Sequence, residues 1–165
     1  MRIAGKWLVL AASLVFCGPA AAATSITTTF QAKIVINAQC LINSANTLDF
    51  GTNGVLAANI DLPTTLSVTC TNLTTYNIGL DGGLNSAGVV TARKMKGGPS
   101  NELISYSLST NTARTTNWGN TIGTDTVGAT GNGALQSYTI YGRVPPQTTP
   151  KPGNYADTIT LTVTY

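Results

Sequence analysis

The sequence predicts an all-β protein whose strands form a β-sandwich. Short runs of alternating apolar and polar residues recur along the chain, and turns rich in Gly, Asn and Pro separate them. No segment keeps the 3.6-residue period of an amphipathic helix. Only 9% of the residues are charged, a composition that suits polar, uncharged strand faces. We therefore expect about seven strands in a single domain.

Residues 1–23 are predicted to be a signal peptide. Arg2 and Lys6 give a positive start, and residues 7–16 form an apolar run that is too short to span a bilayer. Small residues around Ala23 then fit a cleavage site. We expect cleavage after Ala23 or one residue earlier, and therefore export from the cytoplasm.

The mature chain is predicted to be one domain, residues 24–165, without a transmembrane segment. Cys17 does not indicate a lipoprotein, because the bulky Phe16 precedes it. The formal charge of +3 falls to +1 once two basic residues of the signal peptide are removed, which leaves seven basic against six acidic residues. This balance gives no support to nucleic-acid binding.

Two cysteines, Cys40 and Cys70, remain in the mature chain. Because export places them in an oxidising compartment, an isolated pair most simply forms a disulfide that joins two adjacent strands. Such a bridge would close a loop of about 30 residues and stabilise the fold by roughly 3–4 kcal/mol in the chain-entropy model. The alternative is two free, buried thiols.

The stretch Thr24–Cys40 is the longest alternating run. Its even positions carry Ile26, Thr28, Phe30, Ala32, Ile34, Ile36, Ala38 and Cys40, and its odd positions are polar apart from Val35. This is the period of a half-buried strand. Fully extended, the run would reach roughly 50 Å, far beyond an ordinary strand. We expect one part of it to belong to its own domain and another part to reach elsewhere.

Further alternating runs follow in chain order. They occupy residues 48–50, 61–70, 76–80, 89–95, 103–108, 135–144 and 155–165. Residues 120–133 are predicted to be a loop with at most a short strand. The last run alternates Ile159, Leu161, Val163 and Tyr165 with threonines, and the sequence ends there. We therefore expect one edge of this last strand to stay uncovered by its own domain.

No pattern in the chain indicates catalysis, a metal site or a cofactor. The sequence has no histidine, which removes the commonest general base and metal ligand, and its six acidic residues are scattered. The segment 81–85 has the form of a turn rather than of a calcium loop. The only basic cluster, Arg93, Lys94 and Lys96, is interpreted as a solvated hairpin end.

A set of short motifs extends along the whole mature chain. In order, they are Leu48-x-Phe50-Gly51, Val68-x-Cys70, Tyr76-x-Ile78-x-Leu80-x-Gly82, Arg93-x-Met95, the trio Leu103, Tyr106 and Leu108, Trp118-Gly119, Tyr141-Gly142-Arg143-Val144-Pro145 with Gln147, and Pro152-Gly153-x-Tyr155-x-Asp157. Their types and order resemble the spore coat protein U domain family and the subunits of archaic, Csu-type chaperone–usher pili. The C-terminal set is the most specific part of this resemblance.

The resemblance implies an immunoglobulin-like β-sandwich of the incomplete pilin type, which strand donation completes. It further implies a structural subunit of a surface fimbria for adhesion. The partners would be a periplasmic chaperone, an outer-membrane usher and neighbouring pilin subunits. The single domain and the donor-like strand favour a shaft subunit or adaptor over a tip adhesin.

In this interpretation residues 24–36 are the donor strand and the last strand borders the acceptor groove. The expected donor residues are Ile26, Thr28, Phe30, Ala32, Ile34 and Ile36, and the expected groove residues are Ile159, Leu161, Val163 and Tyr165. The alternative is a monomeric or self-complemented coat protein or binding module at the cell surface, in which the first run belongs to a closed sandwich.

Overall fold

The computed structural model describes residues 22–165. The predicted signal peptide therefore lies outside the described residues except for its last two, Ala22 and Ala23. The chain divides into one unit that ends at Val35 and a second unit, Ile36–Tyr165, and each is described by itself.

Residues 22–39 belong to no strand, and their side chains are exposed. The first strand of the structure begins at Cys40, so residues 24–39 add no strand to their own domain, and the donor-strand prediction for residues 24–36 stays a prediction. An extended segment gains the hydrogen bonds of a sheet only from a neighbouring strand. The alternating pattern of residues 24–36 is therefore real in the sequence but is not used in a sheet of the structure.

The second unit contains ten strands, and residues 22–165 include no helix. The strands are β1 (Cys40–Ala45), β2 (Ile60–Cys70), β3 (Thr75–Leu80), β4 (Lys94–Gly97), β5 (Glu102–Ser105), β6 (Ser107–Ser109), β7 (Val127–Thr130), β8 (Leu135–Val144), β9 (Tyr155–Ala156) and β10 (Leu161–Thr164). The all-β prediction is confirmed. Two predicted runs are each divided between two strands, and residues 48–50 form none.

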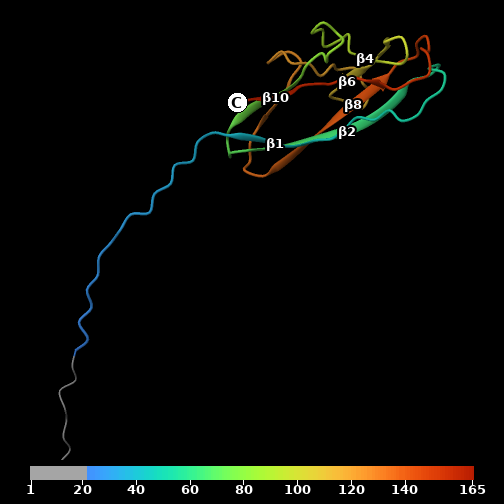
Figure 1. The fold of residues 1–165 in the computed structure, drawn as a ribbon. Coiled ribbons are helices and arrows are strands. Elements are labelled where there is room, and N and C mark those ends of the chain that lie inside the picture. Colours follow the sequence, from blue (N-terminus) through green and yellow to red (C-terminus); the bar gives the residue numbers. More distant parts are fainter. Residues whose placement is uncertain (1–21) are drawn as a thin grey trace, which may run out of the picture. The chain divides into compact units, whose positions relative to one another are not determined.

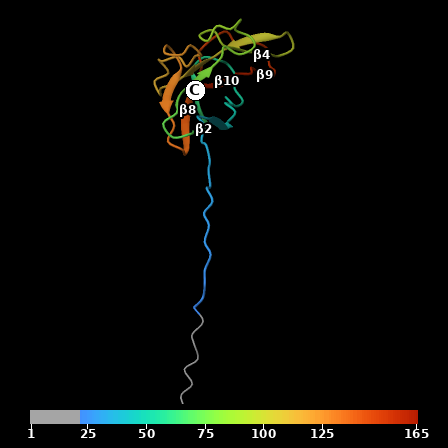
Figure 2. The same ribbon diagram turned by 90° about the vertical axis from the view of Figure 1, so that its left-hand side faces the viewer.

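All strand pairs are antiparallel and form three sheets. The largest has the order β1-β2-β8-β6, the second β10-β3-β7, and the third β5-β4-β9. β2 and β8 run alongside each other over ten paired residues (Figure 1). β4 and β9 form a short pair in the third sheet (Figure 2). This arrangement fits the predicted immunoglobulin-like sandwich.

The core uses the inward faces of strands from the first two sheets. The fully buried apolar side chains of β2 are Leu66, Val68 and Cys70, and those of β3 are Tyr76, Ile78 and Leu80. Trp118 is buried with them and donates its indole N–H to the carbonyl oxygen of Ile78 at 2.9 Å. The alternation that predicted β2 and β3 therefore marks the side chains that hold the two sheets together.

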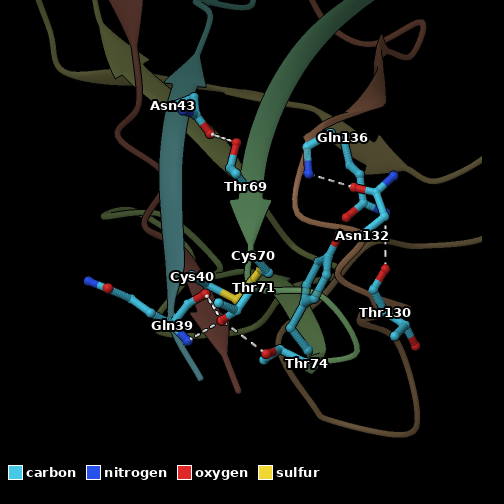
Figure 3. The surroundings of a disulfide bond; sticks show 12 residues. Gln39, Cys40, Asn43, Thr69, Cys70, Thr71, Thr74, Thr130, Asn132 and Gln136 are labelled. Atoms are coloured by element: carbon cyan, nitrogen blue, oxygen red, sulfur yellow. Dashed lines mark hydrogen bonds between the residues drawn. A yellow bond between two sulfur atoms is a disulfide. The ribbon is translucent and has the colours of Figure 1, made fainter. Parts of the chain in front are cut away.

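A disulfide joins Cys40 of β1 to Cys70 of β2, as the sequence predicts. The two residues are direct partners in the antiparallel register. The pairing continues one residue further, where the N–H of Thr71 donates to the carbonyl oxygen of Gln39 at 2.9 Å and the N–H of Gln39 donates to the hydroxyl of Thr71 at 2.7 Å (Figure 3). The bridge thus fixes the start of the edge strand β1.

The expectation of a solvated basic cluster is wrong for Arg93. This side chain is 1% exposed, whereas Lys96 is exposed. The Arg93 guanidinium donates to the carbonyl oxygens of Leu80, Asp81 and Trp118 at 2.9, 2.8 and 2.7 Å. Burial lowers the pKa of Arg93. A cation can be buried here because main-chain acceptors replace the water that it loses.

Candidate functional site

The candidate site is an apolar groove between one stretch of chain that begins at the end of β1 and another that leads from β9 to the start of β10. Residues 45–50 form the first wall, and residues 155–161 form the second wall. The floor consists of Leu80, Met95, Tyr106, Leu108 and Ile140. This part of the groove encloses about 470 Å³.

A second cleft of about 630 Å³ continues the groove beyond Phe50. The two clefts share the residues Leu48, Asp49, Phe50, Met95 and Tyr155, so we treat them as one groove. The further lining of the second cleft includes apolar side chains of three strands, those of Ile60, Ile104 and Val144. A long apolar groove of this kind suits an extended chain better than a small polar ligand.

The first wall alternates between the groove and solvent. Leu48 and Phe50 are half-buried against the core, whereas Asp49 between them is exposed. The absence of a side chain at Gly142 of β8 allows this packing, because a Cβ there would lie 2.4 Å from a methyl group of Leu48. The Phe50 ring also meets the ring of Tyr106 edge-on, with centroids 6.4 Å apart. These contacts hold residues 48–50 in place, although these residues belong to no strand.

The second wall alternates in the same way, and the alternation continues along β10. Ile159, Leu161 and Val163 are half-buried against the core, and the threonines between them are exposed. β10 pairs with β3, and no other strand among residues 22–165 pairs with it. Its second edge therefore offers free main-chain groups along the groove. Tyr165 lies beyond the end of β10 and is 59% exposed.

Asp81 anchors the second wall at Thr160, directly before β10. Its carboxylate accepts the N–H of Thr160 at 2.9 Å, and its own N–H donates to the carbonyl oxygen of Thr160 at 3.1 Å. Burial alone would raise the pKa of Asp81, but hydrogen bonds from Thr160 and Gly83 and the nearby charge of Arg93 outweigh it. The pKa of Asp81 is therefore lower than its usual value, and the carboxylate stays ionised.

Asp157 interrupts the last predicted strand and accounts for the gap between β9 and β10. Its carboxylate accepts the hydroxyl of Tyr106 at 2.8 Å and the N–H of Leu84 at 2.9 Å. It fills the space beside Gly83, where φ is +76° and a Cβ would lie 2.0 Å from the carboxylate. Burial, together with the hydrogen bond to Asp157, raises the pKa of Tyr106. The hydrogen bonds of a half-buried side chain thus take the place of strand pairing next to Asp157.

The predicted groove residues and the predicted donor residues lie in different surroundings in the structure. Ile159 and Leu161 line the groove, and Val163 packs beside them on the core. All six predicted donor residues have exposed side chains, and the exposed fraction is 100% for Ile26, 91% for Phe30 and 83% for Ile34. The chain thus presents an apolar groove and, separately, an exposed apolar segment of strand-like sequence.

Sequence reasoning missed the first wall and most of the floor. The alternation of residues 47–50 was the available signal for the first wall. The floor is assembled from distant parts of the sequence, namely Leu80, Met95, the run that contains Tyr106 and Leu108, and Ile140, so no local pattern could have united them. The turn motif of residues 81–85 gives no sign that Asp81 also holds the second wall.

The groove offers packing surfaces and main-chain hydrogen bonds rather than reactive groups. Within residues 22–165 no three side chains of metal-binding type lie close enough together to hold an ion. Among these residues there is also no helix long and apolar enough to cross a membrane.

The sequence pattern of the Spore Coat Protein U domain matches residues 26–162 of this chain. A relative, Protein U of Myxococcus xanthus, is 35% identical over 168 residues, which cover 94% of this chain and 93% of that protein. The matched residues include both walls and most of the exposed segment 24–36.

A solved structure with a similar fold is a chaperone–tip adhesion subunit pre-assembly complex from the archaic chaperone–usher Csu pili of Acinetobacter baumannii. The similarity has a TM-score of 0.56 and 24% identity over 79% of this chain, and it spans 40% of the matched chain. At this level of identity the similarity shows the fold. The family match is to a coat-protein domain, and on that ground the chain is a structural protein rather than an enzyme.

Proposed function

Since this chain belongs to the Spore Coat Protein U domain family, we propose that it is a structural subunit of a surface fimbria, assembled by the chaperone–usher pathway through donor-strand exchange. In this mechanism residues 24–36 of one subunit, here called the tail, fill the groove of the next subunit. The tail then adds a strand beside β10 and covers its free edge.

The observation that carries the proposal is the match between the open groove and the exposed tail. The groove is apolar, is bordered by the unpaired edge of β10, and alternates in exposure along both walls. The tail alternates with the same period, and its large apolar side chains are almost fully exposed. An open strand edge and an exposed apolar segment are each unfavourable, and insertion of the tail into the groove covers both.

The burial energy of the tail is large enough to hold a fibre together. Four large side chains, Ile26, Phe30, Ile34 and Ile36, contribute about 1.5–3 kcal/mol each when fully buried, which gives roughly 6–12 kcal/mol before entropy costs. Main-chain hydrogen bonds to β10 add to this. A polymer of such subunits therefore resists dissociation without any covalent bond between them.

A periplasmic chaperone and an outer-membrane usher complete the proposal. A subunit with an open groove exposes an apolar strand edge before assembly, so it needs a partner that covers this edge. The similar Csu structure is a complex of a chaperone with a subunit, which supports such a partner here. The predicted signal peptide supports export through the periplasm to the cell surface.

The substitution Phe30→Asp tests this function. It places a carboxylate in an apolar groove, at an expense of several kcal/mol unless the group is neutralised or paired. We expect monomer or chaperone-bound subunit to accumulate in the periplasm, and we expect surface fibres to be absent by electron microscopy.

The matched control is Gln31→Asp, which adds the same charge on the opposite, solvent-facing side of the tail. This variant should assemble almost normally. Fibres of ordinary number and length from Phe30→Asp protein would contradict donor-strand exchange. So would a Phe30→Asp monomer that unfolds under conditions where the wild-type monomer is stable, because the tail would then be part of its own domain.

A second candidate function is a self-complemented coat protein at the cell or spore surface, in which the tail fills the groove of its own subunit. The name of the family and the relative Protein U of Myxococcus xanthus favour this role. Size-exclusion chromatography distinguishes the two functions. The coat protein would elute as a monomer at every concentration, whereas the fimbrial subunit would form oligomers that survive detergent.

A further inference from the structure

We infer that an ion pair between Lys33 of one copy and Asp49 of the next makes a second copy of this chain the preferred occupant of the groove. The pair also sets the register of the tail in the groove. This inference rests on the proposed function and assigns a specific partner to it.

Lys33 is the only charged residue among residues 22–39. It stands at an odd position, so in an extended strand it points away from the face that carries Phe30 and Ile34. When those two side chains enter a groove, Lys33 stays at the solvent-facing rim. Because the rest of the strand is neutral, the ammonium group of Lys33 can meet a given acidic residue of the groove in one register only.

Asp49 is its counterpart on the groove. Residues 45–50 and 155–164 contain two charged side chains, Asp49 and Asp157. Asp157 accepts hydrogen bonds from Tyr106 and Leu84, whereas Asp49 is exposed. Asp49 accepts the N–H of Gly51 at 2.8 Å through one carboxylate oxygen, and the hydrogen bonds among the described residues leave its other oxygen free.

The remaining charges near the groove are already paired. Lys151 lines the second cleft and lies 3.8 Å from the carboxylate of Glu102. The other ion pairs among the described residues join Asp61 to Arg114 and Arg143. Neither Asp49 nor Lys33 belongs to any of these pairs. Of the two acidic side chains on the walls, Asp49 is therefore the exposed one that can still accept an ion pair.

The geometry of an added strand brings the two charges together. A strand between the walls places its outward side chains beside the outward side chains of the first wall, which include Asp49. Directly opposite residues have Cβ atoms about 5 Å apart, and long side chains also reach diagonal neighbours about 7–8 Å away. Asp49 lies where the two clefts join, so Phe30 and Ile34, about 13 Å apart along a strand, enter on either side of it.

The expected role of the pair is to favour correct encounters. Charges at the rim of an interface act mainly on the association rate, and salt screens them. A tail without a cation at this position would still find the apolar groove, but more slowly. The same carboxylate would repel a tail that carries an acidic residue in the register of Lys33.

A double-mutant cycle with purified mature chain tests the inference. The variants are Lys33→Glu, Asp49→Asn and the combination of both, and the readout is the rate at which detergent-resistant oligomers form at low salt. Asp49→Asn is chosen because the asparagine carbonyl still accepts the N–H of Gly51. A control, Thr27→Glu, adds a negative charge on the same face of the tail about 20 Å away.

We expect Lys33→Glu to slow assembly about tenfold and Asp49→Asn about threefold, whereas Lys33→Glu on the Asp49→Asn background should add less than about twofold. In about 0.5 M salt the differences should shrink to less than about twofold. Thr27→Glu should change the rate by less than about twofold at either salt concentration.

Three outcomes would overturn the inference. Equal slowing by Lys33→Glu in both backgrounds would show that Asp49 is not its partner, and no slowing would show that the charge has no role. Wild-type chain that forms no oligomers by itself would exclude a second copy as the occupant. The Phe30→Asp variant, measured alongside, separates the two proposals. If this variant assembles, donor-strand exchange fails as the function. If it blocks assembly while the double-mutant cycle shows no coupling, only the ion pair between Lys33 and Asp49 fails.

Discussion

The tail and the C-terminal stretch, residues 155–165, carry nearly the same sequence pattern in different surroundings. Both alternate large apolar residues with threonine or other polar residues. In the C-terminal stretch Ile159, Leu161 and Val163 are half-buried against the core, whereas Ile26 and Phe30 of the tail are almost fully exposed. The period of a sequence therefore tells which side chains share a face, and it does not tell what covers that face.

The difference has a physical origin in strand pairing. β10 has β3 as a hydrogen-bonded neighbour and Asp81 as an anchor at its start. The tail has no strand partner among residues 22–165. If the tail completes another subunit, a charge on its apolar face should leave folding unchanged, whereas the same charge on β10 should not. The predictions below test this difference, and they run from the largest to the smallest expected change in unfolding free energy.

The largest effect is expected for Leu161→Asp in β10. The substitution places a carboxylate between the core and the groove, and we expect it to lower the unfolding free energy by about 3 kcal/mol or more. A domain of ordinary stability then becomes marginal. Denaturant unfolding of the mature protein measures this effect, and loss of the subunit from the periplasm is its counterpart in cells.

The control for this prediction is the neighbouring residue. Thr162→Asp introduces the same group on the exposed face of β10 and should change the unfolding free energy by less than about 0.5 kcal/mol. If both variants were equally stable, the half-buried face of β10 would not contribute to the core as the structure indicates.

A smaller effect is expected for Asp81→Asn, which keeps an acceptor for Thr160 but removes the charge. Because the folded-state pKa of Asp81 lies below its usual value, ionisation of this group stabilises the fold above about pH 4, and the stabilisation is lost as the pH falls through the folded pKa. We expect the variant to be about 1 kcal/mol less stable at about pH 7. The gap should close at acidic pH, as measured by denaturant unfolding across a pH series. A constant gap down to about pH 2 would contradict a role for the charge.

Sequence reasoning predicted the regular part of the fold well. The predicted runs 61–70 and 135–144 correspond to β2 and β8, and the Cys40–Cys70 bridge is present. In these strands one face is buried by the opposite sheet, so the local alternation and the tertiary environment agree. The prediction failed for Arg93, because the three carbonyl oxygens that it binds come from two segments distant in the sequence.

The groove could be predicted only in part. The alternation of Ile159 and Leu161 placed them on one face of the last strand, next to a free edge. The break before β10 was not predictable, because it depends on the contacts of Asp157 with Tyr106 and Leu84. Those contacts join residues about 50 and 70 positions apart in the sequence. In a single sequence Asp157 is one isolated polar residue, and nothing next to it indicates its partners.

The smallest effect on stability, with the largest effect on assembly, is expected when residues 24–34 are deleted. Because the side chains of this segment are exposed, its removal should change the unfolding free energy of the isolated domain by less than about 0.5 kcal/mol. The truncated chain should still form the Cys40–Cys70 bridge and accept the tail of a full-length copy, but it should donate none. Small amounts mixed with wild-type chain should therefore end growing fibres and shorten them in proportion, as electron microscopy can measure. Fibre length that does not depend on the truncated chain would contradict donation to a neighbour, and a truncated domain less stable by several kcal/mol would show that the tail completes its own sandwich.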